Sequence, residues 1–210
     1  MFSDLIHERL FQDFVTLFVV VNPISTIPLF LALTRHEPAE AARKTALRSV
    51  VIATIILLAF VAIGQLLLNA LEIELGAFRI AGGLVLLVIS LRMVLESAQH
   101  PSEEGEETGA GHDVAVFPLA TPFIAGPGAI LAAVLLTDHT LYSVPQQVGT
   151  TLVMLGVLVL QYVLLLASGT VNRVLRETGT NVISRIMGLI LAALSIETIL
   201  IGIRAAFSLG

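Results

Sequence analysis

Six long apolar stretches, separated by polar connectors, constrain this chain of 210 residues more than any other feature. A helix needs about 20 mostly apolar residues to cross the hydrocarbon core of a bilayer. Only 13% of the residues are charged, whereas a soluble domain carries about 25%, so the chain cannot build a water-facing surface. The sequence therefore predicts an all-α membrane protein with a single domain. Its six expected transmembrane helices are Phe11–Leu33, Leu47–Leu71, Phe78–Leu95, Val114–Leu136, Val148–Thr170 and Val182–Phe207.

The distribution of lysine and arginine over the connectors predicts the orientation of the chain. With six spans, the connectors after the first, third and fifth lie on one side of the membrane. That side holds eight basic residues, namely Arg35, Arg43, Lys44, Arg48, Arg92, Arg173, Arg176 and Arg185. The other side holds three, Arg9, Arg79 and Arg204. We therefore expect both termini outside the cell and the acidic loop 98–112 in the cytoplasm.

Two motifs occur twice in the same order, which indicates an internal duplication. NPISTIP begins at Asn22, and its counterpart TPFIAGP begins at Thr121, 99 residues later. RIAGGLVLL begins at Arg79, and RIMGLILAA begins at Arg185, 106 residues later. Each motif alone is a weak signal, but two matches at nearly the same offset favour a repeat.

Each copy would contain three spans, so the second copy must enter the membrane from the opposite side. We therefore expect two inverted-topology three-helix repeats, at 1–97 and 113–210, joined by the loop 98–112. This architecture is common in secondary transporters. It allows one fold to adopt two near-equivalent packings, each open to one face of the membrane.

Proline pairs predict that the first and fourth spans are broken helices, near Asn22–Pro28 and Thr121–Gly128. Proline lacks an N–H and displaces the carbonyl four residues earlier, so two prolines five residues apart leave several backbone groups unpaired. Such backbone persists in a membrane only where it is buried in protein or lines a wet cavity. Half-helices that begin there direct N–H groups towards the midplane, and freed carbonyls can hold a cation. A zwitterion such as an amino acid needs both.

The residues at these breaks resemble a known family. FVVVNPISTIPLFLALT, FRIAGGLVLLVISLRMVL, FPLATPFIAGPGAI and SRIMGLILAAL are similar to stretches of the MarC family of multi-pass inner-membrane proteins, and AGPGAI is the most specific. The family's length and six-span plan cover the whole chain. The resemblance implies a location in the cell (inner) membrane and a relative of LysE-type exporters, some of which move small neutral amino acids. The family name refers to antibiotic resistance, which is not evidence of drug transport.

The resemblance also places substrate contacts on the two broken segments. The contact residues that it implies are Asn22, Ser25, Thr26, Thr121, Gly126 and Gly128. The prolines that break the two helices complete the candidate site, and they are Pro23, Pro28, Pro122 and Pro127.

Glu197 is the only acid well inside a predicted span, and an intramembrane carboxylate is a functional candidate by default. It is a possible coupling residue, with H⁺ and Na⁺ both open as coupling ions. The structural alternative is an ion pair with Arg204, seven residues later on the same helix face. The resemblance implies an amide in this region, so the acid is a departure that leaves the coupling open.

The chain shows no pattern of an enzyme, a metal site or a nucleic-acid-binding protein. Cysteine is absent, and the five histidines fall in termini or connectors. HExxH, GxSxG and P-loop patterns do not occur. We therefore expect no catalytic residue, metal or cofactor. The repeats and the proline pairs predict a secondary transporter that works by alternating access, and the resemblance implies small neutral amino acids or similar metabolites as its substrates. A passive channel, an accessory membrane subunit, and two helix kinks without a site are the alternatives. The physiological substrate, the direction of flux and the oligomeric state are open.

Overall fold

The computed structural model describes residues 2–95 and 113–207, which form helices joined by short turns. In chain order the elements are α1 (Phe2–Val21), α2 (Thr26–Leu33), α3 (Ala39–Ala70), α4 (Leu75–Leu95), η2 (Ala115–Ile124), α5 (Pro127–Leu136), α6 (Val144–Leu166) and α7 (Ser168–Ala206). The predicted acidic loop 98–112 lies outside the described residues. Its cytoplasmic location therefore stays a prediction.

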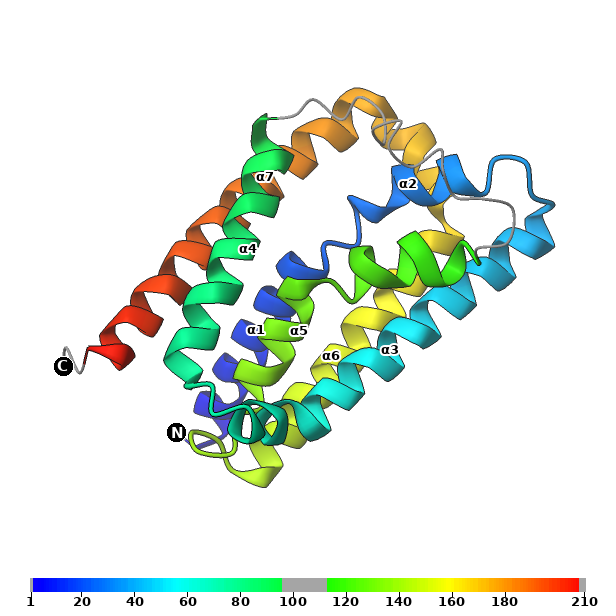
Figure 1. Cartoon of the computed structure of the whole chain (residues 1–210). Helices are drawn as coiled ribbons and strands as arrows, with labels where there is room; N and C mark the ends of the chain where they lie inside the picture. The colour runs from blue at the N-terminus through cyan, green and yellow to red at the C-terminus, as the bar shows by residue number, and fades with distance from the viewer. Residues whose placement is uncertain (1, 96–112, 208–210) are drawn as a thin grey trace.

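Four helical segments of the described chain are long and apolar enough to cross a bilayer: α3, α4, α6 and Thr178–Ala206 of α7. Two more spans result if each bent pair is taken as one, namely α1 with α2, which bend by 41°, and η2 with α5, which bend by 54°. The protein is thus all-helical with four to six candidate spans. Figure 1 shows that α1 begins and α7 ends at the same end of the bundle, as an even number of crossings requires.

Two helices extend well beyond the spans expected from hydropathy. α3 begins at Ala39 rather than near Leu47, and α7 begins at Ser168 rather than near Val182. The added segments contain AEAARKT and NRVLRETGTN, and the first of these is rich in the helix-favouring residues alanine, glutamate, lysine and arginine. Polar residues end the membrane-crossing part of a helix, but they do not end its ladder of hydrogen bonds.

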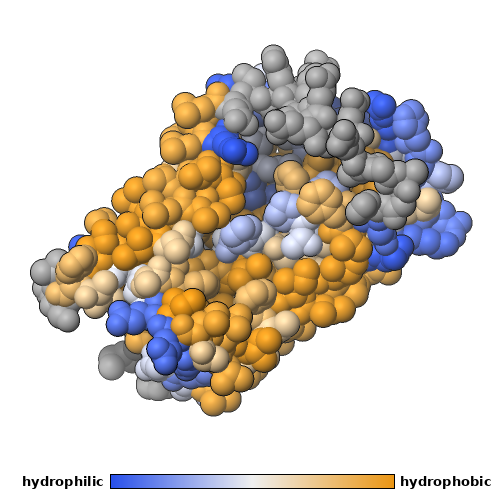
Figure 2. Space-filling model, in the orientation of Figure 1, coloured by the Kyte–Doolittle hydropathy of each residue, from blue (hydrophilic) through white to orange (hydrophobic). Residues whose placement is uncertain are grey.

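The helices form two packed groups. α4 and α7 run side by side, and α1, α3, η2, α5 and α6 form the second group (Figure 1). The short helix α2 contacts both groups, through α7 and through η2 and α6. Fully buried side chains such as Leu17, Leu57, Leu119 and Leu158 lie in the core of this second group. Figure 2 shows that apolar side chains cover most of the visible face and that strongly hydrophilic ones gather towards its ends. A lipid-facing belt is arranged in this way.

Small residues bring α4 and α7 close together in a reciprocal pattern. A Cβ placed on Gly83 of α4 would lie 3.0 Å from the carbonyl oxygen of Ser195 on α7. A Cβ placed on Gly188 of α7 would lie 3.1 Å from the carbonyl oxygen of Ser90 on α4. Both serines are fully buried, and each hydroxyl donates to the carbonyl three residues earlier on its own helix. The segment GLVLLVIS therefore faces GLILAALS, with glycine against serine at both ends.

Candidate functional site

The first break lies between α1 and α2. α1 ends at Val21, and Asn22 has a φ of 49°, in the left-handed region that asparagine tolerates better than most residues. Its N–H still donates to the carbonyl of Phe18 at 2.9 Å, as in the last turn of a helix. Pro23 follows and cannot continue the hydrogen-bond ladder. The Asn-Pro pair therefore ends α1 and redirects the chain into α2.

Side chains of the first break contact both α4 and α7. Asn22, which is 9% exposed, donates from Nδ2 to the Sδ of Met93 on α4 at 3.5 Å. The hydroxyl of Ser25 lies 2.9 Å from that of Ser184 on α7. Buried Thr26 donates to the carbonyl of Asn22 at 3.4 Å. The side chain of Ser25 is directed to α7, so it does not cap α2. The N-terminus of α2 therefore has no hydrogen bond from a capping side chain.

The second break lies between η2 and α5. η2 is an irregular helical segment in which Phe117 and Thr121 are extended, and each precedes a proline, which disfavours the helical region for the residue before it. Pro127 opens α5 in the first turn, where its missing N–H has no intrahelical partner to lose. Gly126 has no side chain to cap this helix, and a Cβ there would collide with the carbonyl oxygen of Pro122.

The two breaks are neighbours near the centre of the molecule, where the end of α1 and the start of α5 lie side by side (Figure 1). A Cβ on Gly128, at the start of α5, would lie 2.9 Å from Cγ1 of Val20 in the last turn of α1. It would also collide with Leu86 of α4. The residues that end the segments before each break, Val21 and Ile124, belong to one buried apolar cluster. The fold thus brings together the two segments on which the sequence placed its candidate site.

The candidate residues differ in burial. Four of the ten are buried at the breaks, namely Asn22, Pro23, Thr26 and Gly128, and three prolines are exposed, namely Pro28, Pro122 and Pro127. Ser25, Thr121 and Gly126 are half-buried. The hydroxyl of Thr121 donates to the carbonyl of Val116 in its own segment at 3.3 Å. The buried polar groups of the site therefore come mainly from the first break.

Glu197 lies apart from the breaks. Ser184 is the contact of α7 with the first break, and Glu197 follows it by a distance of roughly 20 Å at 1.5 Å per residue. Glu197 is exposed, and its helical position is opposite Ser195, which faces α4. Among the ion pairs of the described residues, none joins Glu197 to Arg204. The coupling role of Glu197 stays a prediction.

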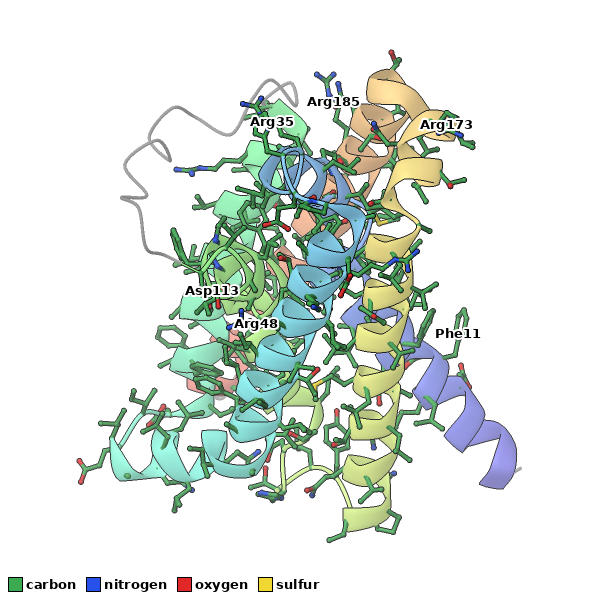
Figure 3. All side chains as sticks on the ribbon, turned by 90° about the vertical axis from the view of Figure 1, so that its right-hand side faces the viewer. Phe11, Arg35, Arg48, Asp113, Arg173 and Arg185 are labelled. Carbon is green, nitrogen blue, oxygen red and sulfur yellow. The ribbon has the colours of Figure 1, made fainter. Side chains whose placement is uncertain are left out.

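Two aspartates outside the predicted site join the two halves of the chain. Asp13 of α1 is 4% exposed, accepts a 2.6 Å hydrogen bond from the Thr150 hydroxyl of α6, and lies 3.7 Å from Arg9. Asp113, just before η2, lies 2.5 Å from the guanidinium of Arg48 on α3, and Figure 3 shows the two pointing towards each other. Each aspartate stands eight or nine residues before the motif of its own half, which is the signal that could have revealed them.

A buried carboxylate also lies where α5 turns into α6. Asp138 is 1% exposed and accepts hydrogen bonds from the N–H and the hydroxyl of Thr140 at 2.8 Å and 2.7 Å. Burial raises the pKa of Asp138, but the hydrogen bonds from Thr140, the nearby side-chain amide of Gln65 and the charge of Arg79 outweigh it. The pKa of Asp138 is therefore lowered from its ordinary value.

We expect the thermal stability of the detergent-solubilised protein to decrease as the pH falls through the lowered pKa of Asp138. A carboxylate with a lower pKa in the folded state stabilises the fold above its unfolded pKa, and this contribution is lost as the pH falls through the folded pKa. Asp138→Asn should reduce the slope of melting temperature against pH below about pH 4. The exposed Glu74→Gln is the control and should keep the wild-type slope. Equal slopes in all three proteins would contradict the assignment.

A chain with four to six candidate spans and two bent helix pairs that meet at its centre is an integral multi-pass membrane protein. Residues 7–207 match the model of the family described as MarC family integral membrane protein, and the chain belongs to this family.

Similar proteins occur in bacteria and archaea. UPF0056 membrane protein YhcE of Escherichia coli is 36% identical over 200 residues, which cover 94% of this chain and 93% of YhcE. A UPF0056 membrane protein of Methanocaldococcus jannaschii is 36% identical over 199 residues, with 92% and 95% covered. UPF0056 inner membrane protein YhgN of Escherichia coli is 32% identical over 197 residues, with 90% and 93% covered. No solved structure matches the chain.

Proposed function

We propose that this protein is a secondary transporter that moves small neutral amino acids, or similar small zwitterionic metabolites, across the cell membrane by alternating access. The observation that carries the proposal is the meeting of the two breaks, through Val20 and Gly128. Each break begins a helix whose N-terminus has no side-chain cap hydrogen bond. Broken helices that meet inside a bundle are typical of substrate sites in transporters.

We also propose that the two halves are inverted repeats, with both broken spans at corresponding positions. The helix pairing supports this relation. In the proposed repeat, α1 and α2 correspond to η2 and α5, α3 corresponds to α6, and α4 corresponds to α7. Accordingly, α1 and α2 contact α6, and η2 and α5 contact α3. In the same way α4 contacts α5, and α7 contacts α1 and α2. The pairs α4–α7 and α3–α6 are their own counterparts, and the contact of α1 with α5 corresponds to that of η2 with α2. A twofold axis in the plane of the membrane exchanges contacts in this way.

Particular residues support the same symmetry. The reciprocal contacts of Gly83 with Ser195 and of Gly188 with Ser90 are those of two antiparallel copies of one segment. Asp13 joins the first span to α6, and Asp113 joins the fourth span to α3. In inverted repeats these two contacts lie on opposite sides of the breaks. Releasing one while the other holds would open the site to one face at a time, which alternating access requires.

The proposed orientation places both termini outside the cell. Figure 3 shows Arg35, Arg173 and Arg185 together at one end of the molecule. This orientation is supported because connectors rich in lysine and arginine face the cytoplasm. The name of YhgN describes that relative as an inner membrane protein. We propose the same membrane for this chain.

Single cysteines test the orientation, because the chain has none of its own. His139→Cys lies between α5 and α6, and Asn172→Cys lies near the start of α7; both positions are exposed. An impermeant maleimide applied to intact cells should label the first variant, and it should label the second only after permeabilisation. The reverse pattern would invert the orientation. Labelling of both variants from outside would contradict the six-span topology.

The transport proposal predicts counterflow. Liposomes with purified protein, preloaded with unlabelled L-alanine, should transiently accumulate radiolabelled L-alanine. The reason is that unlabelled substrate occupies most binding sites that face the lumen, so labelled substrate that has entered is slow to leave. Liposomes without protein are the control, and leucine and lysine serve as larger and charged competitors. A passive channel would give flux without saturation or counterflow. An accessory subunit would give no flux for alanine, glycine or serine, and either result would contradict the proposal.

A further inference from the structure

We propose that the side-chain amide of Gln161 on α6 is part of the substrate site, where it binds the ammonium group of a small zwitterionic amino acid. The carboxylate of the same molecule would lie at the uncapped N-terminus of α2. This inference rests on the proposed transport function. It adds a residue from an unbroken helix to a site otherwise predicted on the broken helices.

Gln161 is a buried polar side chain without a protein partner. It is 0% exposed, and in the described part of the chain neither its Nε2 nor its Oε1 has a hydrogen-bond partner. Buried polar side chains normally have partners, and in membranes they often bind across helices. Ser90, Ser195 and Thr150 all follow this rule. An amide with both atoms unpaired inside a span therefore indicates a partner that is not part of the chain.

The register of α6 against α1 places Gln161 at the height of the first break. The hydrogen bond from Thr150 to Asp13 joins the two helices, which run in the same direction (Figure 1). Gln161 stands eleven residues after Thr150, and eleven residues after Asp13 is Ile24, inside the break. Eleven residues correspond to roughly 16 Å along α6, and the eight residues from Asp13 to the end of α1 at Val21 correspond to roughly 12 Å.

The helical face that carries Gln161 is directed to the interior of the bundle. Gln161 shares this face with Met154, Leu158 and Leu165, at the spacing of three to four residues that defines one side of a helix. These three residues belong to the buried cluster that also contains Val21 at the end of α1. Both α1 and α2 contact α6. The amide is therefore directed into the helical bundle, against which the end of α1 also packs, and away from lipid.

The chemistry of the amide complements that of the break. The N-terminus of α2 carries a partial positive charge, which favours a carboxylate. Among its first residues Pro28 has no N–H and the N–H of Ile27 donates to the carbonyl of Ile24 at 3.2 Å, so the N–H of Thr26 is the donor available to a ligand. The ammonium group of an α-amino acid is two bonds from its carboxylate carbon, so it needs an acceptor nearby, and Oε1 of Gln161 is one. Nε2 can donate to the carboxylate or to a carbonyl of the break.

Gln161→Leu tests this role, because it removes both hydrogen-bonding atoms and nearly keeps the volume. In counterflow of L-alanine we expect the KM to rise by about tenfold or more. Gln65→Leu is the matched control on α3, where the amide accepts the N–H of His139 at 3.2 Å, and it should keep the wild-type KM. Competition by propionate, which lacks the ammonium group, supplies a second readout. The wild type should prefer L-alanine to propionate strongly, and Gln161→Leu should lose most of this preference.

A folded Gln161→Leu with the KM and the preference of the wild type would overturn the inference and leave the transport function intact. Absence of counterflow in the wild type for alanine, glycine and serine would overturn the proposed function and the inference with it. If Gln161→Leu does not fold, Gln161→Met is the second variant. Its unbranched side chain has no N–H and no oxygen, and the same two outcomes decide.

Discussion

Replacing Gly202 by leucine should abolish most of the folded protein, whereas replacing Gly156 by leucine should leave the yield unchanged or raise it. A Cβ on Gly202 of α7 would lie 2.8 Å from the carbonyl oxygen of Gly76 and 2.8 Å from Cγ1 of Ile80, both on α4. A backbone oxygen cannot turn away as a side chain can. The larger residue would therefore separate α4 from α7 along their shared face.

The two substitutions are chemically identical, so their difference isolates helix packing. Leucine favours a helix over glycine by up to about 1 kcal/mol, and this gain applies at both positions. Overpacking a tight contact costs about 1–3 kcal/mol and occasionally more, and it applies only at Gly202, since a Cβ on Gly156 would meet nothing within 4 Å. The measurements are the monodisperse fraction and the melting temperature in detergent. Equal behaviour of the two variants would contradict the close packing of α4 against α7.

Replacing Asn22 by glycine should raise the KM for L-alanine about 5- to 150-fold without loss of folded protein. This range corresponds to about 1–3 kcal/mol for a buried substrate group left without its hydrogen bond. Glycine adopts the φ of 49° at this position without strain, so only the side-chain amide is lost. Asn22→Ala would add backbone strain of about 1–2 kcal/mol and should also lower the melting temperature.

Glu72→Gly provides the matched control for Asn22. Glu72 also has a positive φ, of 55°, but it is exposed in the turn between α3 and α4, away from the breaks. This variant should keep the KM of the wild type. An unchanged KM in Asn22→Gly would show that Asn22 does not bind the substrate. A higher KM in both Asn22→Gly and Glu72→Gly would show that the effect comes from the change of backbone and not from the amide of Asn22.

Much of the architecture could be predicted because it depends on local properties. Apolar length predicted the stretches that α3, α4 and α6 span, and the family resemblance is confirmed over nearly the whole chain. The same reasoning placed helix boundaries poorly at Ala39 and Ser168. Hydropathy reports where a chain can lie in hydrocarbon, whereas helical hydrogen bonding continues into water wherever the backbone is not interrupted.

The candidate site was predictable only in part. Asn22 and Pro23 end α1 for local reasons, since one tolerates a positive φ and the other lacks an N–H. The partners of the break were not predictable, because Met93 and Ser184 follow it by more than 70 residues and no motif links them. Glu197 shows the same limit: its place inside a span is visible in the sequence, but its distance from the breaks is not.

By itself, then, the sequence determined that this chain lies in a membrane and which segments resemble each other, because apolar length and repeated motifs can be recognised along the chain alone. It also predicted helix breaks at the two proline pairs, because proline acts on its own neighbourhood. Only the tertiary structure decided that the two breaks touch through Val20 and Gly128 and that Gln161 is fully buried. It also decided that Asp13 contacts Thr150 and that Asp113 contacts Arg48. These contacts depend on how helices distant in the chain pack and in which register. That is set by the fit of whole surfaces, such as the glycine faces of α4 and α7, which no single stretch of sequence contains.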